Sequence, residues 1–231
     1  MQSILQRHAR VTLFAGHYGS GKSTAAMAFA AALRAAFPQD PIAVADLDIV
    51  NPYFRTKDCA EQLAALGVEL IASDYASGNV DVPALPGSAY RVTEDRSLRC
   101  VIDVGGDDRG ALALGRYAPA LKAEGDYDML GVINCFRPLT RTPEDTVAVL
   151  REIEEAGGLP FTALVNNPAL GRLTTPEDVL ASADYAAAVS RLMGIPVAFT
   201  AARRSVCEAL PDGMLLLPLD HTISHGGIEN N

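Results

Sequence analysis

Short apolar runs alternate with longer helical patterns along most of the chain of 231 residues. The runs are rich in β-branched residues and apolar at successive positions, which is typical of strands covered on both faces of a sheet. They occupy residues 11–14, 42–45, 68–72, 99–104, 129–134, 161–165 and 196–200. Because helical patterns separate most of these runs, we expect an α/β fold of three layers, with a mostly parallel central sheet of about seven strands and helices on both faces.

The helical patterns carry recognisable start signals. Residues 22–37 are apolar on nearly every side, which is typical of a buried helix. The sequence Thr-Pro-Glu-Asp occurs at residues 142–145 and again at residues 175–178. It combines a capping Thr, a Pro suited to the first helical position and acids suited to the positive helix end, so we expect two helices to begin there. Residues 73–95 lack a clear period and are either a functional loop or a surface excursion with a short helix.

Composition and charge favour one globular domain over residues 1–231. Hydrophobic residues make up 49% of the chain, and 19 Lys and Arg oppose 28 Asp and Glu, for a net charge of −9. We expect no nucleic-acid partner, because proteins that bind nucleic acids usually present a basic face. The longest apolar run, residues 25–33, is too short for a membrane span, so we expect no membrane insertion and a cytoplasmic location. The four cysteines form no C-x-x-C pair, which argues against a zinc ribbon.

One motif carries the chemistry. Residues 16–23 read Gly-His-Tyr-Gly-Ser-Gly-Lys-Ser, the G-x-x-x-x-G-K-[ST] pattern of a phosphate-binding loop between a strand and a helix. Its glycines let backbone N–H groups converge on a phosphate, and the helix adds its positive end. In such a loop Lys22 reaches the β- and γ-phosphates and Ser23 ligates Mg²⁺. The predicted nucleotide-binding residues are Gly16, His17, Tyr18, Gly19, Ser20, Gly21, Lys22, Ser23 and Thr24.

Three aspartates follow two of the apolar runs. Asp46 and Asp48 come after residues 42–45, and Asp103 precedes Gly105 and Gly106, whose lack of a side chain lets a loop approach the γ-phosphate. Because ligands of open α/β sheets bind at the carboxyl ends of the strands, we expect all three aspartates beside the phosphate loop. Mg²⁺ keeps several waters and needs few carboxylates. The predicted metal ligands are Ser23, Asp46 and Asp103.

Residues in the later part of the chain indicate which base the bound nucleotide carries. No Asn-Lys-x-Asp tetrapeptide, which marks guanine-specific proteins of this type, occurs in the sequence. The run 161–165 ends instead at Asn166, whose side-chain amide offers a donor and an acceptor to an adenine edge. An Asx turn before Pro168 is the alternative role for this asparagine. We expect ATP as the nucleotide.

These segments together resemble the MinD/ParA/CobQ/CobB group of P-loop ATPases, a branch of the signal-recognition-particle and nitrogenase-iron-protein-like class. The resemblance covers almost the whole chain, because the phosphate loop, Asp46 to Asp48, Asp103 to Gly106 and Asn166 occur in the group's order. Within it, GHYGSGKST at 16–24, DLDIVNPYFR at 46–55 and DVGGDDRGALALGRY at 103–117 resemble a bacterial subgroup usually described as ATP-binding or as cobyrinic acid a,c-diamide synthase-like.

The resemblance implies a P-loop NTPase that binds ATP with Mg²⁺, forms a nucleotide-dependent homodimer and hydrolyses ATP slowly. In that scheme Asp48 positions the attacking water, Asp46 lies near the metal and Asp103 holds a metal-bound water. The catalytic residues implied are therefore Lys22, Asp46 and Asp48.

The chain departs from the group at one position. Where the group has a signature lysine in the phosphate loop, this chain has His17. A neutral imidazole does not replace a fixed cation at pH 7, whereas a protonated one could. Arg55 and Arg109 are the candidates for an additional cation that offsets charge as the γ-phosphoryl group leaves.

Three functions remain open from the sequence. The first is an ATP-binding switch with slow hydrolysis that regulates or matures an unknown protein partner. The alternative is a small-molecule ATP-dependent ligase or kinase related to the cobyrinate amidoligases, in which residues 73–95 cover the second substrate. Stimulation of hydrolysis by a protein, or by a small carboxylate or alcohol, separates these two. The third is a nucleotide-sensing module with negligible hydrolysis, which equal, near-zero turnover of the wild type and Asp48→Asn would favour.

Overall fold

The computed structural model describes residues 9–47, 56–72, 87–106 and 113–219. Its strands form one sheet in the order β3-β2-β4-β1-β5-β6-β7-β8, and every neighbouring pair among them is parallel. The strands are β1 (Val11–Ala15), β2 (Ile42–Asp46), β3 (Glu69–Ala72), β4 (Arg99–Asp103), β5 (Tyr127–Ile133), β6 (Ala163–Asn166), β7 (Val197–Arg203) and β8 (Leu216–Leu219). The predicted α/β architecture and parallel sheet are confirmed.

The sheet has one strand more than the seven runs indicated. β8 is a four-residue strand, Leu-Leu-Pro-Leu, that pairs with β7 at the edge of the sheet. Pro218 lacks the N–H that a central strand needs, but an edge strand tolerates it. The proline is the reason that the sequence pattern did not indicate a strand there.

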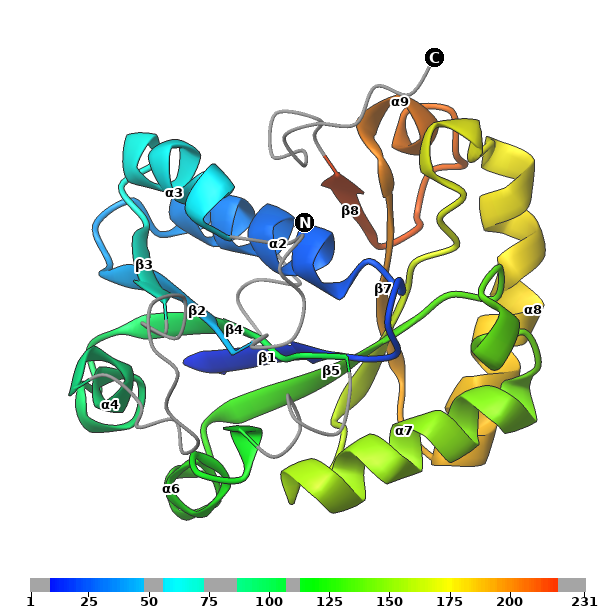
Figure 1. Ribbon diagram of the computed structural model, residues 1–231. Helices are drawn as coiled ribbons and strands as arrows, with labels where there is room; N and C mark the ends of the chain where they lie inside the picture. The colour runs from blue at the N-terminus through cyan, green and yellow to red at the C-terminus, as the bar shows by residue number, and fades with distance from the viewer. Residues whose placement is uncertain (1–8, 48–55, 73–86, 107–112, 220–231) are drawn as a thin grey trace.

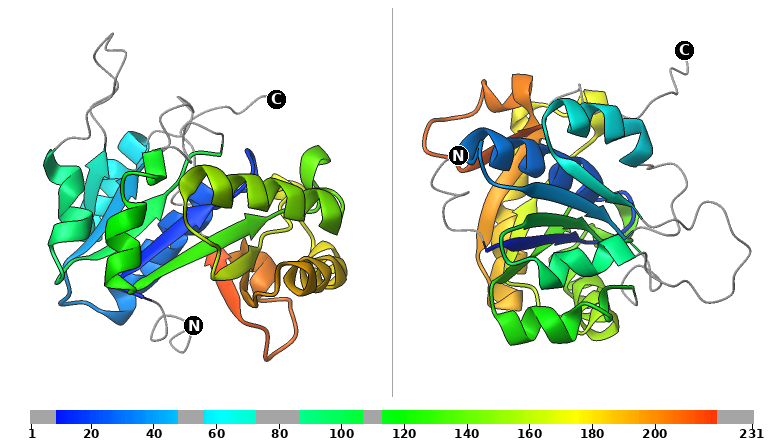
Figure 2. Two further views of the ribbon diagram at one scale, coloured as in Figure 1. Left: turned by 90° about the horizontal axis from the view of Figure 1, so that it is seen from below. Right: turned by 90° about the vertical axis from the view of Figure 1, so that its left-hand side faces the viewer.

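Helices cover both faces of the sheet, as Figures 1 and 2 show. The first face carries α2 and α3, and the second carries α4, α6, α7 and α8. The helices are α2 (Lys22–Ala36), α3 (Thr56–Ala65), α4 (Gly87–Glu94), α6 (Ala118–Glu124), α7 (Pro143–Gly157), α8 (Pro176–Met193) and α9 (Arg204–Cys207), with short 3₁₀ helices η2 (Pro138–Thr140) and η3 (Gly171–Leu173). Among the helices of the described ranges, none is long and apolar enough to cross a membrane.

The two predicted helix starts are confirmed. The Thr142 hydroxyl accepts a hydrogen bond from the Asp145 amide at 3.1 Å, and Thr175 and Asp178 form a reciprocal capping box. The interval 73–95 is helical in its last part, because α4 begins at Gly87. Residues 73–86, where the covering loop was predicted, lie outside the described residues.

Aromatic packing fixes helix α2 against the sheet. The Phe29 ring of α2 lies between Phe14 of β1, with ring centroids 5.4 Å apart, and Phe199 of β7, at 6.1 Å. All three side chains are fully buried. Because α2 follows β1 directly, this packing also fixes the loop that joins them at the carboxyl end of β1.

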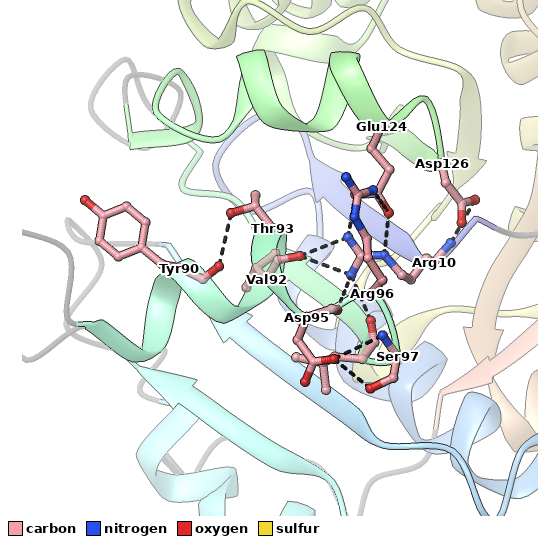
Figure 3. Close-up of polar contacts among 10 residues, drawn as sticks. Arg10, Tyr90, Val92, Thr93, Asp95, Arg96, Ser97, Glu124 and Asp126 are labelled. Atoms are coloured by element: carbon pink, nitrogen blue, oxygen red, sulfur yellow. Dashed lines mark hydrogen bonds and ion pairs between the residues drawn. The ribbon is translucent and has the colours of Figure 1, made fainter.

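A buried ion pair lies at the amino end of β1, opposite the loop that joins β1 to α2 (Figure 3). Arg10, just before β1, donates to both carboxylate oxygens of Glu124 at 2.6 Å and to the carbonyls of Val92, Asp95 and Leu98. The hydrogen bond from Arg10 lowers the pKa of the Glu124 carboxyl and raises that of the Arg10 guanidinium. The network ties the α4–β4 and α6–β5 connections to the start of the central strand.

Candidate nucleotide-binding site

The phosphate loop lies at the carboxyl end of the central strand. β1 pairs with β4 on one side and β5 on the other, and the chain builds the sheet outward in both directions from it. In open α/β sheets, ligands bind at such a switch point. Gly19 and Gly21 have φ of 75° and 87°, which L-residues rarely adopt, so the glycines of the motif meet a conformational need of the loop.

Two side chains from neighbouring loops hold the carbonyls of the phosphate loop. Arg137, after β5, donates from Nε to the Gly19 carbonyl at 2.7 Å, and Asn167, after β6, donates from Nδ2 to the Ser20 carbonyl at 2.6 Å. The N–H and C=O groups of a trans peptide point in opposite directions. Fixing the two carbonyls therefore fixes the directions of the Ser20 and Gly21 N–H groups.

The start of α2 is left open to an anion. Its N-cap is Gly21, with no side-chain cap, and its first turn contains no acid, whereas α7 and α8 each have a capping Thr and two acids. The uncapped N–H groups and the positive helix end favour a negative ligand. Lys22 and Ser23 begin this helix and are both buried. The loop residues and Thr24 thus form one continuous strand–loop–helix segment, as predicted.

The P-loop lysine reaches the loop that follows β4. A Cβ on Gly106 would lie 2.9 Å from Lys22 Nζ and 3.0 Å from the Tyr18 amide nitrogen. Only a residue without a side chain fits there without displacing the phosphate loop. Lys22 and the segment after Asp103 are therefore adjacent in the folded protein.

Asp46 and Asp103 lie side by side on the first face of the sheet. They are register partners in the neighbouring parallel strands β2 and β4, about 4.8 Å apart in the hydrogen-bonding direction. Val44 and Val101, two positions before each, pack in the core beneath α2, and strand side chains alternate between faces. The two aspartates therefore occupy the same face as the start of α2.

This donor set suits Mg²⁺. A Ser hydroxyl and two carboxylates are hard oxygen ligands, and Mg²⁺ completes its shell with water and substrate phosphates. Across the described residues, no group of three or more His, Cys, Asp or Glu side chains gathers as a metal site. Asp48, the predicted water-positioning residue, and the two predicted cations Arg55 and Arg109 lie outside the described residues.

His17 is a neutral imidazole in the ligand-free protein. Burial and the charge of Lys22 lower the pKa of its imidazole, which keeps the ring neutral at pH 7. Its carbonyl accepts a hydrogen bond from the Ser20 amide at 3.0 Å and so closes a turn within the loop. Tyr18 at the tip of the loop is 61% exposed.

Of the two neighbouring asparagines, Asn167 faces the phosphate loop. Asn166 belongs to β6 and points to the second face, where its Nδ2 donates to the Ser182 hydroxyl of α8 at 2.8 Å in the buried core. Asn167 points to the first face, because successive side chains alternate. A role for Asn166 at the base stays a prediction, and its amide nitrogen is engaged by α8. The sequence pattern did not identify Asn167 or Arg137 as contacts of the phosphate loop. The one signal for either was the pair of adjacent asparagines at residues 166 and 167.

Replacing Gly21 with alanine is expected to lower the free energy of unfolding by about 2–5 kcal/mol. The new Cβ would overlap the Asn167 amide nitrogen, and the positive φ adds backbone strain. Gly125→Ala is the matched control, because Gly125 has φ 71° and nothing within 4 Å of an added Cβ. Urea unfolding measures both variants. Equal losses would show that the Asn167 contact does not constrain the loop.

Comparisons with solved structures show the fold. No protein-family model and no curated protein sequence matches the chain. The signal recognition particle receptor FtsY from Elizabethkingia anophelis is 17% identical with a TM-score of 0.52, over 86% of this chain and 63% of that one. Chloroplast FtsY from Physcomitrella patens is 19% identical with a TM-score of 0.56, over 84% and 58%.

FtsY from Mycoplasma mycoides is similar to the same degree, with 16% identity, a TM-score of 0.52 and coverage of 83% and 60%. The chain spans about three-fifths of the length of these structures. The resemblance to the MinD/ParA group stays a prediction. The chain has the α/β fold of P-loop NTPases, with its phosphate loop at the carboxyl end of the central strand.

Proposed function

We propose that this chain is a Mg²⁺-dependent ATP-binding protein that hydrolyses ATP slowly and acts as a nucleotide switch for a protein partner. The observation that carries the proposal is the contact between Lys22 and Gly106. A P-loop lysine binds the β- and γ-phosphates. A γ-phosphate on Lys22 therefore lies against the segment after β4, and its loss on hydrolysis changes the contacts of that segment.

Specific residues are proposed to bind the metal ion and to position the attacking water. Ser23, Asp46 and Asp103 would hold Mg²⁺, directly or through its waters, and the bound ion would offset charge on the β- and γ-phosphates. Asp48, two residues after Asp46, is the proposed water-positioning acid. The carboxylates of β2 and β4 thus stand on the side of the loop where the γ-phosphate is proposed to lie.

Two features support adenine and slow turnover. The sequence has no Asn-Lys-x-Asp tetrapeptide, and the segment after β6 presents an asparagine pair instead. Lys22 is the one fixed cation within the phosphate loop, since His17 is neutral at pH 7. Fast phosphoryl transfer uses a further cation at the γ-phosphate, and a partner is the proposed stimulus that completes the site.

A nucleotide panel tests the proposal. Mg·ATP at about 100 times its Kd is expected to stabilise the fold by about 2.7 kcal/mol, which raises Tm by about 5–10 °C. ADP should give a smaller shift, and removing Mg²⁺ with a chelator should reduce the ATP shift. A larger shift with GTP than with ATP would contradict the adenine assignment.

Light scattering and turnover test the switch itself. We propose that ATP, but not ADP, brings two copies together, so the scattering mass should double with ATP alone. A chain that stays monomeric with ATP would remove the dimer from the proposal. Strong stimulation of hydrolysis by a small carboxylate or alcohol, in place of a protein, is the result expected of the ligase or kinase alternative.

A further inference from the structure

Arg137 is held against the phosphate loop by a rigid turn. The Arg137 amide donates to the Asn134 carbonyl at 3.2 Å, and its carbonyl accepts from the Thr140 amide at 3.1 Å. Asn134 is itself fully buried, with its side chain bonded to the Phe136 amide and the Ala169 carbonyl. The backbone that carries the arginine is therefore fixed before any ligand binds.

The guanidinium of Arg137 lies next to Gly19, and its charge has no acidic partner among the described residues. Within the part of the chain that the structure describes, only its Nε has an acceptor, the Gly19 carbonyl at 2.7 Å, and a Cβ on Gly19 would lie 3.4 Å from Nε and 3.6 Å from Cζ. No carboxylate within the described ranges pairs with it, whereas Arg10, Arg91 and Arg99 each pair with one. No described residue accepts a hydrogen bond from either Nη group, so both can donate to a ligand.

An anion explains this arrangement better than the carbonyl alone does. Among the described residues, this half-buried arginine has one neutral carbonyl as its acceptor, so most of its charge is left to be offset by water or by an anion. The planar guanidinium matches phosphate oxygens in two-point contacts. The loop that it contacts has Lys22 as its one fixed cation, for a ligand that carries several negative charges.

We infer that Arg137 is a polyphosphate-binding residue that supplies, from the same chain, the second cation of the phosphate loop, while its Nε holds the Gly19 carbonyl. The inference rests on the proposed function for the identity of the ligand as a nucleotide. The position is distinct from the signature-lysine position occupied by His17 and from Arg55 and Arg109. It places the extra charge on the β5 side of the loop.

Two substitutions at Arg137 distinguish the effect of its charge on ligand binding from its role in holding the loop. In the full chain, Arg137→Gln removes the charge but keeps an amide donor, and Arg137→Lys keeps the charge but loses the planar fork. For Arg137→Gln, Kd for Mg·ATP and for inorganic pyrophosphate is expected to rise about tenfold or more, with Tm of the free protein nearly unchanged. Arg137→Lys, which keeps the charge but has neither the fork nor Nε, should lose less affinity than Arg137→Gln. Arg141→Gln, at an exposed arginine four residues on, is the matched control and should bind as the wild type does.

Titration calorimetry at two salt concentrations gives the readout. The affinity of Arg137→Gln should depend less on salt than that of the wild type, because one charge is gone. Unchanged affinity in Arg137→Gln, or equal losses in Arg137→Gln and Arg137→Lys, would overturn the inference and leave the nucleotide switch standing. If the wild type binds pyrophosphate through Arg137 but binds no nucleotide, the proposed function fails and the inference holds. A wild type that binds neither overturns both.

Discussion

Lys22→Ala is expected to remove almost all of the stabilisation that Mg·ATP gives. The lysine begins α2, is 4% exposed, and its Nζ lies beside the segment that follows β4. Charge-assisted hydrogen bonds contribute about 1.5–3 kcal/mol each, so losing contacts to two phosphates weakens binding at least about 100-fold. At a concentration of 100 times the wild-type Kd, the remaining stabilisation is about 0.4 kcal/mol, or about 1 °C in Tm.

The control for this experiment is Lys122→Ala. Lys122 is an exposed lysine of α6, which covers the second face of the sheet, away from the start of α2. Its variant should keep the full shift of about 5–10 °C. If Lys22→Ala also kept that shift, the nucleotide would bind somewhere other than the phosphate loop.

Arg10→Leu is expected to lower the free energy of unfolding by about 3–5 kcal/mol. The substitution leaves the buried Glu124 carboxylate without its bidentate partner and removes the guanidinium donor from three carbonyls, of which that of Asp95 keeps the Leu98 amide. Arg96 also pairs with Glu124, at 2.5 Å, but its side chain is 62% exposed. Arg96→Leu is thus the matched control, with an expected loss of about 0–1 kcal/mol. Urea unfolding at pH 7 measures both, and equal losses would contradict the role given to burial.

The pH dependence of the same variants gives an independent check. Because the folded-state pKa of Glu124 is lowered, mainly by the bond from Arg10, its stabilisation is present above its unfolded pKa. That stabilisation is lost as pH falls through the lowered folded pKa. The difference in stability between the wild type and Arg10→Leu should therefore shrink below about pH 4. A difference that stays constant with pH would show that the carboxylate charge does not contribute.

The sequence predicted the scaffold of the site better than the contacts that hold it. The strand, loop and helix at residues 11–36 were recognisable because apolar pattern, glycine chemistry and motif spacing agree there. Asp46 and Asp103 were correctly predicted to lie together at the carboxyl ends of neighbouring strands, because parallel strands bring these ends together. These features depend on local pattern or on strand direction alone.

The side chains that fix the loop depend on the tertiary fold. Arg137 is 118 positions from Gly19 in sequence, and a single arginine before a proline has no distinguishing pattern. Choosing between Asn166 and Asn167 requires knowing which face of β6 meets the loop. That choice follows from the order of the strands and the placement of α8, which the sequence pattern does not specify.

The position of β1 has a consequence for synthesis of the chain. β1 is made first but lies in the middle of the sheet, and its first residue, Val11, pairs with Cys100 and Tyr127. At about 5–20 residues per second, the nascent strand and the apolar helix α2 wait on the order of 5–20 s for both partners to be made. Such non-local pairing is slow, and it exposes apolar surface in the meantime. The phosphate loop, which needs Arg137 and Asn167, reaches its final shape only after the ribosome has added residue 167.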